Sequence, residues 1–342
     1  MKVLIIGGTG NISTAITRQL IQLDVDVTLY NRGKTAGDFP GKISTIVGNR
    51  YDHQAFEEQI ADVGMFDCVI DMIGYDPEDV NSLIRAVQGR TEQVIFCSTI
   101  DVYTKPAETY PIVEGVERLP SPSFPYAYKK AICEKNLDDA ARRGAFALTI
   151  IRPAHTYNDS QAPIPFIGSG MHFFKRIRQG KPIIVLGNGT SFWGSAHRDD
   201  VAPTFVAAIG NLKVYGKDYH VTAEECLTWE QHFQTVADVM GAPPISFVHI
   251  PTDFLGRMAP KAAEWSVVNF HYNNIFDNSA AIHDLGYRYT IPWREGVERM
   301  IAYHDARTKI DTCPDDRLYN TLVDVWLKLG DTAVEQMRSL NA

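Results

Sequence analysis

The sequence predicts an α/β fold built on a doubly wound parallel sheet, with a smaller lobe in the C-terminal part. Apolar runs typical of buried strands recur in the first half of the chain, at 3–8, 26–31, 43–49, 67–74, 93–99 and 147–153. Segments with helical spacing, such as 12–23 and 56–63, lie between them. Because strands that alternate with helices pair in parallel under helices on both faces, this order indicates repeated βαβ units.

The second half of the chain differs from the first in composition and in its expected elements. Residues 154–195 are rich in glycine, proline, aromatic residues and histidine, which predicts loops around one helix at about 170–179. A helix at 198–212, a strand at 218–223, a helix at 228–240 capped by Thr228 and a strand at 246–251 follow. The rest is mostly helical and ends in a predicted helix pair at 315–340. We expect one buried stripe on that pair, formed by Leu318, Leu322, Val325, Leu329 and Val334.

These patterns predict the following division of the chain. A sheet domain covers 1–153 and is completed by about 195–223, a lobe is formed by 154–194 and 224–310, and a helical extension covers 311–342. A chain of 342 residues is long enough for two such parts.

Composition narrows the class of protein. The net charge of −8 provides no general attraction to nucleic acid or to anionic membranes. The most basic segment, KRIRQGK at 175–181, is expected to be a helix C-terminus. Five scattered cysteines without a CxxC pair suggest neither disulfides nor a metal site. With no apolar run of about 18 residues and no signal-peptide pattern, we expect a cytoplasmic protein.

The run GGTGNIS (7–13) follows the first strand and opens the first helix. Gly7 and Gly10 would allow a tight turn close to a pyrophosphate, and the helix start at Asn11 and Ile12 would supply N–H groups. The alternative is a plain strand–helix turn. A P-loop is excluded for GKT at 33–35, because Thr28 stands where that motif needs glycine. The context therefore predicts a Rossmann-type dinucleotide site.

The end of the second strand bears on which dinucleotide binds. Asn31 stands where an acidic residue would select NAD, and Arg32 and Lys34 could pair with a 2′-phosphate. The residues thus favour NADP over NAD. The alternative is that Arg32 is a solvated surface residue and NAD binds.

The stretch SFPYAYKK (123–130) places a tyrosine and a lysine on one helix face. Tyr126 and Lys130 are four residues apart, and Pro125 suits the first position of a helix. Tyr128 has Ile132 at the corresponding position, and Lys129 faces elsewhere. We expect Tyr128 and Lys129 to be packing or surface residues.

Together these motifs resemble the extended branch of the short-chain dehydrogenase/reductase superfamily, the NAD-dependent epimerases and dehydratases, over roughly residues 1–300. The resemblance rests on GGTGNIS, on IFCSTIDVY (95–103), on YAYKK (126–130), on IIRPAHTY (150–157), on SAHRDDVA (195–202) and on DNSAAIHDLGYRYTIPWREGV (277–297). It implies three catalytic residues: Thr99, Tyr126 and Lys130. The residues expected at the cofactor are Gly7, Gly10, Asn11, Ile12, Asn31, Arg32, Lys34, Asn49, Ile73, Lys130 and Pro153. Those expected at the substrate are Ser98, Asp101, His155, Trp193 and His197.

The resemblance implies hydride transfer between NADP or NAD and a secondary alcohol of a sugar-like substrate. Tyr126 would act as general acid and base, with its pKa lowered by Lys130 and by the oxidised nicotinamide. Asp101 falls where dehydratases carry a proton-abstracting glutamate, but a loop-capping aspartate is the favoured interpretation. A homodimer is expected by resemblance only.

Several positions depart from the family pattern and keep alternatives open. Asp71 replaces a usual histidine, His155 a usual asparagine, and Phe192 and Trp193 fall where an arginine for a diphosphate is common. These departures weaken the case for a nucleotide-diphosphate sugar. The alternatives are a reductase or dehydrogenase of another substrate, and a non-catalytic dinucleotide- or RNA-binding relative of the atypical branch.

Overall fold

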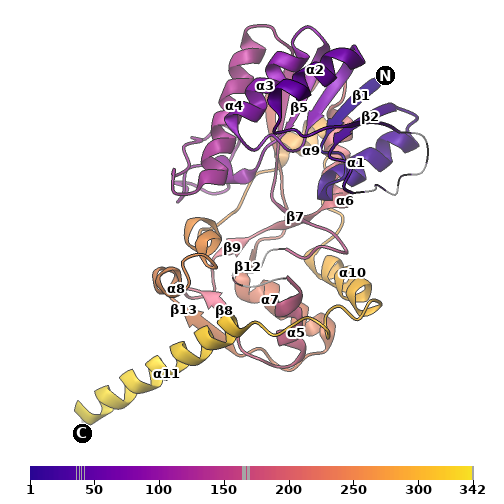
Figure 1. Cartoon of the computed structure of the whole chain (residues 1–342). Coiled ribbons are helices and arrows are strands. Elements are labelled where there is room, and N and C mark those ends of the chain that lie inside the picture. Colours follow the sequence, from indigo (N-terminus) through magenta and orange to yellow (C-terminus); the bar gives the residue numbers. More distant parts are fainter. Residues whose placement is uncertain are drawn as a thin grey trace. The chain divides into compact units, whose positions relative to one another are not determined.

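A seven-stranded parallel sheet with the strand order β11-β6-β5-β4-β1-β2-β3 forms the centre of the first part of the chain (Figure 1). The computed structural model describes residues 1–35, 37, 39, 41, 43–163, 167 and 170–340. The sheet strands are β1 (Lys2–Ile6), β2 (Asp26–Asn31), β3 (Ser44–Val47), β4 (Phe66–Asp71), β5 (Thr91–Cys97), β6 (Ala147–Pro153) and β11 (Lys217–Val221). The order reverses between β1 and β4, which confirms the predicted doubly wound sheet and places a crevice at the carboxyl ends of these two strands.

Helices cover both faces of this sheet because its strands are apolar on both sides. In β1, Val3 and Ile5 join one core and Leu4 and Ile6 join the other. The first core packs against α1 (Asn11–Gln22), α6 (Arg198–Ala208) and α9 (Ser279–Leu285). The second packs against α2 (His53–Val63), α3 (Pro77–Val87) and α4 (Pro125–Arg142). The short elements η1 (Ile100–Val102), η2 (Leu212–Val214), β7 (His155–Tyr157) and β10 (Ser195–His197) complete this part, and β7 pairs in parallel with β10.

The chain forms two compact units. Unit 1 contains Met1–Tyr157, Ser195–Glu224 and Phe276–Ile291, and unit 2 contains Asn158–Gly194, Glu225–Ile275 and Pro292–Ala342. Residues 276–291 were expected in the lobe, but they pack with the sheet. The Asp284 carboxylate accepts hydrogen bonds from Lys217 Nζ and Tyr219 Oη of β11, each at 2.8 Å.

Unit 2 is mostly helical. It contains α5 (Gly170–Arg178), β8 (Ile183–Leu186), β9 (Phe192–Trp193), β12 (Leu227–Thr228), α7 (Trp229–Met240), β13 (Phe247–Ile250), α8 (Thr252–Met258), a π-helical turn η3 (Ser266–Phe270), α10 (Trp293–Asp305) and α11 (Arg317–Leu340). β8 pairs in parallel with β13, and β9 pairs antiparallel with β12. In the described part of the chain, no helix has both the length and the apolarity needed to cross a membrane.

The C-terminal segment corrects one expectation. It is a single helix, α11, rather than a pair, and the predicted buried stripe was wrong. Only Leu322 of that stripe is buried, whereas Leu318, Val325, Leu329 and Val334 are 44–52% exposed. Leu318 and Val325 lie on other faces of the helix, and Leu329 and Val334 lie beyond the turns that pack on unit 2.

Candidate active site

The glycine turn after β1 brings backbone into the crevice at the carboxyl end of the sheet. Gly7 has φ +87°, and a Cβ on it would lie 2.6 Å from Ile73 Cγ2, so only glycine fits. The Ser13 hydroxyl donates a hydrogen bond to the Gly7 carbonyl (2.6 Å) and accepts one from the Gly10 N–H (2.8 Å). Ser13 stands where a third glycine is usual, and here it closes the turn.

The first turn of α1 follows this loop directly. Asn11 and Ile12 are its first residues, and the first N–H groups of a helix have no partner within the helix. The Asn11 side chain donates to the Thr156 carbonyl (2.8 Å), and the Ile12 side chain packs on the core. A phosphate would therefore meet the backbone of these two residues rather than their side chains.

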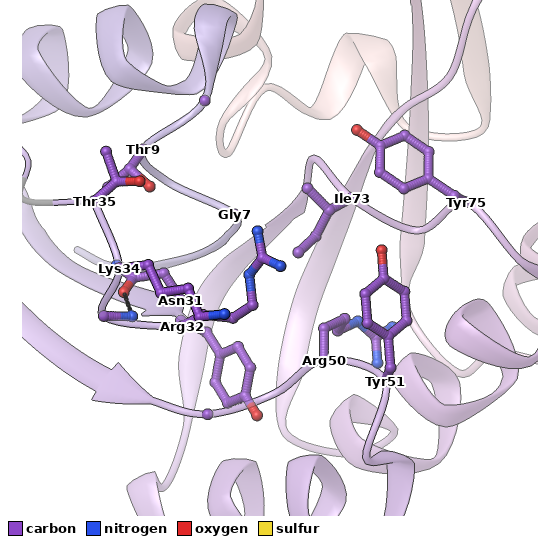
Figure 2. Close-up of a pocket in the computed structure, with 14 residues that line it drawn as sticks. Gly7, Thr9, Asn31, Arg32, Lys34, Thr35, Arg50, Tyr51, Ile73 and Tyr75 are labelled. Carbon is purple, nitrogen blue, oxygen red and sulfur yellow. Dashed lines mark hydrogen bonds between the residues drawn. The ribbon is translucent and has the colours of Figure 1, made fainter.

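A pocket opens in front of the glycine turn (Figure 2). It is lined by Gly7, Thr9, Gly10, Tyr30, Asn31, Arg32, Gly33, Lys34, Thr35, Gly48, Arg50, Tyr51, Ile73 and Tyr75. Asn49 lines an adjoining hollow, together with Arg32 and Lys34. The Asn31 side chain accepts a hydrogen bond from the Gly33 N–H (2.8 Å), which bends the chain after β2. The pocket thus combines a glycine turn, a helix N-terminus and, at the end of β2, the cations Arg32 and Lys34. This combination fits a dinucleotide.

One residue of the pocket lining, Arg50, belongs to a buried pair that the sequence did not indicate. Arg50 Nη2 lies 3.7 Å from Asp71 Oδ2 and donates a hydrogen bond to the Asp79 carbonyl. The Arg50 guanidinium also lies 4.0 Å from the centre of the Phe56 ring. Both side chains of the pair are at most 2% exposed. Asp71 Oδ1 also accepts a hydrogen bond from the Ile73 N–H (3.0 Å). Asp71 therefore fixes the turn in which Ile73 packs against the glycine loop.

The three residues predicted to be catalytic lie in unit 1. Thr99 caps η1: its Oγ1 accepts from the Asp101 N–H (3.2 Å) and donates to Asp101 Oδ2 (3.1 Å). The Thr99 hydroxyl also hydrogen-bonds the Tyr126 side chain. Tyr126 stands in the first turn of α4, after Pro125 at its first position. Lys130, one turn further, is 1% exposed and donates from Nζ to the Cys97 carbonyl (2.7 Å).

Tyr75, which the sequence reasoning missed, connects these residues to the pocket. Its ring centroid lies 6.3 Å from that of Tyr126, and Lys130 Nζ lies 4.9 Å from the centre of the Tyr75 ring. Tyr75 also lines the pocket with Gly7, and Figure 2 shows it with Ile73 and Tyr51 on the side opposite Thr9 and Asn31. The available signal was an aromatic residue just after a strand that ends at the crevice.

The protein environment raises the pKa of Tyr126. Burial is the main cause, and the charge of Asp101 and the neighbouring Tyr75 add to it, while the hydrogen bond with Thr99 opposes them. We expected a lowered pKa from Lys130 and a bound oxidised cofactor, so the chain's own contribution has the opposite sign. Burial also raises the pKa of Tyr75 to about 12 and that of the Cys97 thiol to about 11. Cys97 is thus a packing residue rather than a reactive thiol.

Asp101 is held on two sides. Lys105 Nζ approaches Asp101 Oδ1 at 3.3 Å, Thr99 binds the other oxygen, and Asp101 is only 7% exposed. Burial lowers the pKa of Lys105, and Asp101 opposes that shift. These contacts favour the interpretation of Asp101 as a loop residue over that of a base facing substrate.

The remaining predicted residues have partners of their own. Ser98 is 4% exposed and donates its N–H to the Ile151 carbonyl (2.8 Å). His197 caps α6 by accepting the Asp199 N–H at Nδ1 (3.2 Å).

Three further positions have structural surroundings. Trp193 belongs to unit 2, where it stacks on Trp229 (5.3 Å) and meets the edge of Phe270 (5.0 Å). His155 is half-buried at the start of β7, and Pro153 is buried at the end of β6.

A buried polar network connects β6, α4 and β11. Arg152 binds both oxygens of Glu134, at 2.8 and 2.9 Å, and donates from Nη1 to Tyr103 Oη (2.7 Å). His220 Nδ1 contacts the Asp277 carbonyl (3.0 Å), which can only accept, so this nitrogen carries the proton. The Tyr103 hydroxyl therefore donates to His220 Nε2. Burial lowers the pKa of His220 to about 3, and the charge of Arg152 adds to this.

The model of the NAD dependent epimerase/dehydratase family matches residues 3–222. The chain belongs to this family. It is therefore an NAD-dependent enzyme of the epimerase/dehydratase type, and the membership confirms the resemblance drawn from the sequence.

Individual relatives are more distant. The chain is 27% identical over 274 residues to the chloroplast stem-loop binding protein of 41 kDa b of Arabidopsis thaliana, covering 74% of this chain and 67% of that protein. It is 22% identical over 277 residues to 2'-dehydrokanamycin reductase of Streptomyces kanamyceticus, covering 81% and 77%. A solved UDP-glucose 4-epimerase of Thermotoga maritima with UDP-glucose aligns with a TM-score of 0.71 and 19% identity, over 90% of this chain and 100% of that one. At this identity the structural likeness supports the fold alone.

Proposed function

We propose that this enzyme transfers hydride between a nicotinamide dinucleotide and a secondary alcohol, or its ketone, on a sugar or sugar-derived substrate. One observation carries the proposal. Tyr75 lines the dinucleotide pocket and also contacts Tyr126 and Lys130, so the pocket and the proton-transfer residues form one site within unit 1. A curated relative named UDP-N-acetyl-alpha-D-glucosaminuronate decarboxylase supports the substrate class.

Each residue has a defined part in this proposal. When bound, the nicotinamide accepts or gives the hydride. Thr99 holds the substrate oxygen beside Tyr126, whose hydroxyl gives a proton to a ketone or takes one from an alcohol. Lys130 places a positive charge near the phenol and favours its ionised form.

A finer proposal concerns the cofactor. Arg32 and Lys34 line both hollows at the end of β2, and Asn31 turns its side chain to the Gly33 N–H instead of offering a carboxylate. We propose that NADP binds more tightly than NAD. Because hydrogen bonds to charged groups contribute more than neutral ones, Arg32→Ala should weaken NADPH binding about tenfold or more and leave NADH binding nearly unchanged. Equal weakening of both dinucleotides would reject the preference.

The proposed role of Tyr126 is tested by comparing two tyrosines of α4. The full chain is screened for reduction or release of the dinucleotide with sugars, sugar nucleotides and aminoglycoside ketones. Tyr126→Phe should keep dinucleotide binding and lose about 10²-fold or more of turnover, whereas Tyr128→Phe should keep both. Turnover that survives in Tyr126→Phe would refute the mechanism. No turnover on any substrate in the parent chain, with dinucleotide still bound, would support a non-catalytic relative.

An RNA-binding function receives less support. The most basic segment lies at the end of α5, and its cations pair with carboxylates of the same unit. Lys175 contacts Asp315 at 3.1 Å, and Arg178 contacts Asp305 at 2.8 Å and Asp311 at 3.1 Å. These pairs leave little unneutralised charge for a phosphate backbone.

A further inference from the structure

The second half of α11 is a helix with an apolar face that nothing in the described chain covers. Tyr319, Leu322 and Val323 are 4–5% exposed where the helix packs on unit 2, and Trp326 contacts Phe254 with ring centroids 5.8 Å apart. From residue 327 to residue 340, every side chain is exposed. Figure 1 shows this end of α11 extending as a lone helix from unit 2.

The uncovered stretch has a regular pattern. At about 100° per residue, its apolar residues fall within an arc of about 160°, and all of its polar residues fall outside. The arc contains Leu327, Leu329, Gly330, Ala333, Val334, Met337 and Leu340. It also contains Tyr319, Leu322 and Val323, so the exposed face continues the face that packs on unit 2.

A helix of this length is marginal on its own in water, because most helical stability comes from packing of the apolar face. Single exposed apolar residues are ordinary, but here they are contiguous. Leu329, Val334, Met337 and Leu340 are 49–78% exposed. The face therefore requires an occupant.

The charges of the stretch identify the occupant. Lys328 and Arg338 balance Asp331 and Glu335, so the helix lacks the excess of cations typical of helices that lie on anionic membranes. Asp331 and Arg338 lie on the same flank of the apolar arc, about 20° apart in projection and seven residues apart along the chain.

We propose that residues 327–340 pair antiparallel with the same residues of a second copy of this chain. In that orientation Asp331 of one copy faces Arg338 of the other, twice, whereas in a parallel pair the flanks that carry these residues lie on opposite sides of the interface and the two charges do not meet. The midpoint between Asp331 and Arg338 falls just after Val334, close to the middle of the uncovered stretch. Gly330 and Ala333 lie on the facing side and allow close approach of the two axes.

The assembly mass in solution tests this pairing. Leu329→Glu combined with Met337→Glu places two charges in the apolar arc, and the control Thr332→Glu with Ser339→Glu places two on the polar side. Light scattering after size exclusion at micromolar concentration should give half the parent mass for the first variant and the parent mass for the control. Equal masses for all three chains would overturn the proposal. Tryptophan fluorescence checks that unit 2, which holds all five tryptophans, remains folded.

Disulfide trapping tests the orientation. In a chain with Cys226 and Cys313, the cysteines that are not fully buried, replaced by serine, Val334→Cys should form a linked dimer on mild oxidation. Leu327→Cys should not, because antiparallel pairing places these positions about 20 Å apart. Linkage at both positions would overturn the antiparallel arrangement. Linkage at neither would overturn pairing between copies, and co-sedimentation of the parent with phosphatidylserine vesicles would identify a lipid surface as the occupant instead.

Discussion

Buried neutral histidine makes the stability of unit 1 depend on pH in a way that one substitution can remove. His220 is 0% exposed, donates from Nδ1 to the Asp277 carbonyl and accepts from Tyr103 at Nε2, so it has no room for a second proton. Its pKa falls from the usual value of 6.5 to about 3. Because the folded pKa lies below the unfolded one, the unfolded chain binds more protons between these values. Stability is therefore fully present above pH 6.5 and decreases as the pH falls toward 3.

The magnitude follows from this shift. A pH of 5.0 lies about 1.5 units below the pKa of the histidine in the unfolded chain. Each of these pH units lowers the free energy of unfolding by about 1.4 kcal/mol. The parent chain should thus lose about 2 kcal/mol more stability than His220→Asn when the pH falls from 7.5 to 5.0. The variant should be less stable at pH 7.5, because it leaves the Tyr103 hydroxyl without its acceptor. The prediction concerns only the difference between the two pH values.

Urea unfolding followed by far-ultraviolet circular dichroism measures this difference. All five tryptophans lie in unit 2, so their fluorescence serves as an internal control that His220→Asn should not alter. Burial also lowers the pKa of His232, in unit 2, to about 4. Unit 2 should therefore lose stability of its own at acid pH, by the same amount in the parent and in the variant. If the parent and the variant lose equal stability between pH 7.5 and 5.0, the reasoning about a buried neutral His220 fails.

Two further substitutions test the framework of the site. Gly7→Ala should weaken dinucleotide binding about tenfold or more, measured by NADPH fluorescence, because the residue has φ +87° and the new Cβ would lie 2.6 Å from Ile73; unchanged affinity would contradict the assigned turn. Arg152→Met should lower the free energy of unfolding by about 3–5 kcal/mol in urea titration, since it leaves Glu134 buried with its bidentate partner removed. Arg118 Nη1 also donates to Glu134 Oε2 (2.8 Å), and a loss below about 1 kcal/mol would show that this contact alone satisfies the carboxylate.

The sequence was sufficient for the sheet because local patterns carried the information. Alternation of apolar runs and helical spacing is a property of each segment, and the glycine turn and the Pro125 helix start are short-range signals. The position of Tyr126 in the first turn of α4 followed from these. The helix pair predicted for 315–340 was wrong because periodicity shows which residues share a face but does not show whether anything covers that face.

Contacts between distant segments could not be predicted. Asp71 was seen only as a departure from a family pattern, yet in the structure it pairs with Arg50 and fixes the turn that carries Ile73. Tyr75 drew no attention, because nothing in its own segment indicates that α4 brings Tyr126 and Lys130 beside it. The surroundings of Asp101 include Lys105, four residues further along an irregular loop. No helical or strand period gives the direction of a side chain there, so this contact could not be predicted.

The electrostatics of Tyr126 suggest why the site combines so many charges in a small volume. Burial and Asp101 raise the pKa of the phenol, so without a bound cofactor Tyr126 stays protonated at neutral pH and can act as a general acid. Acting as a base requires added positive charge, which an oxidised nicotinamide supplies and a reduced nicotinamide does not. On the proposed function, the direction of proton transfer then follows the oxidation state of the cofactor. An acidic neighbour such as Asp101 sharpens that dependence, because it keeps the phenol protonated whenever the cofactor's positive charge is absent.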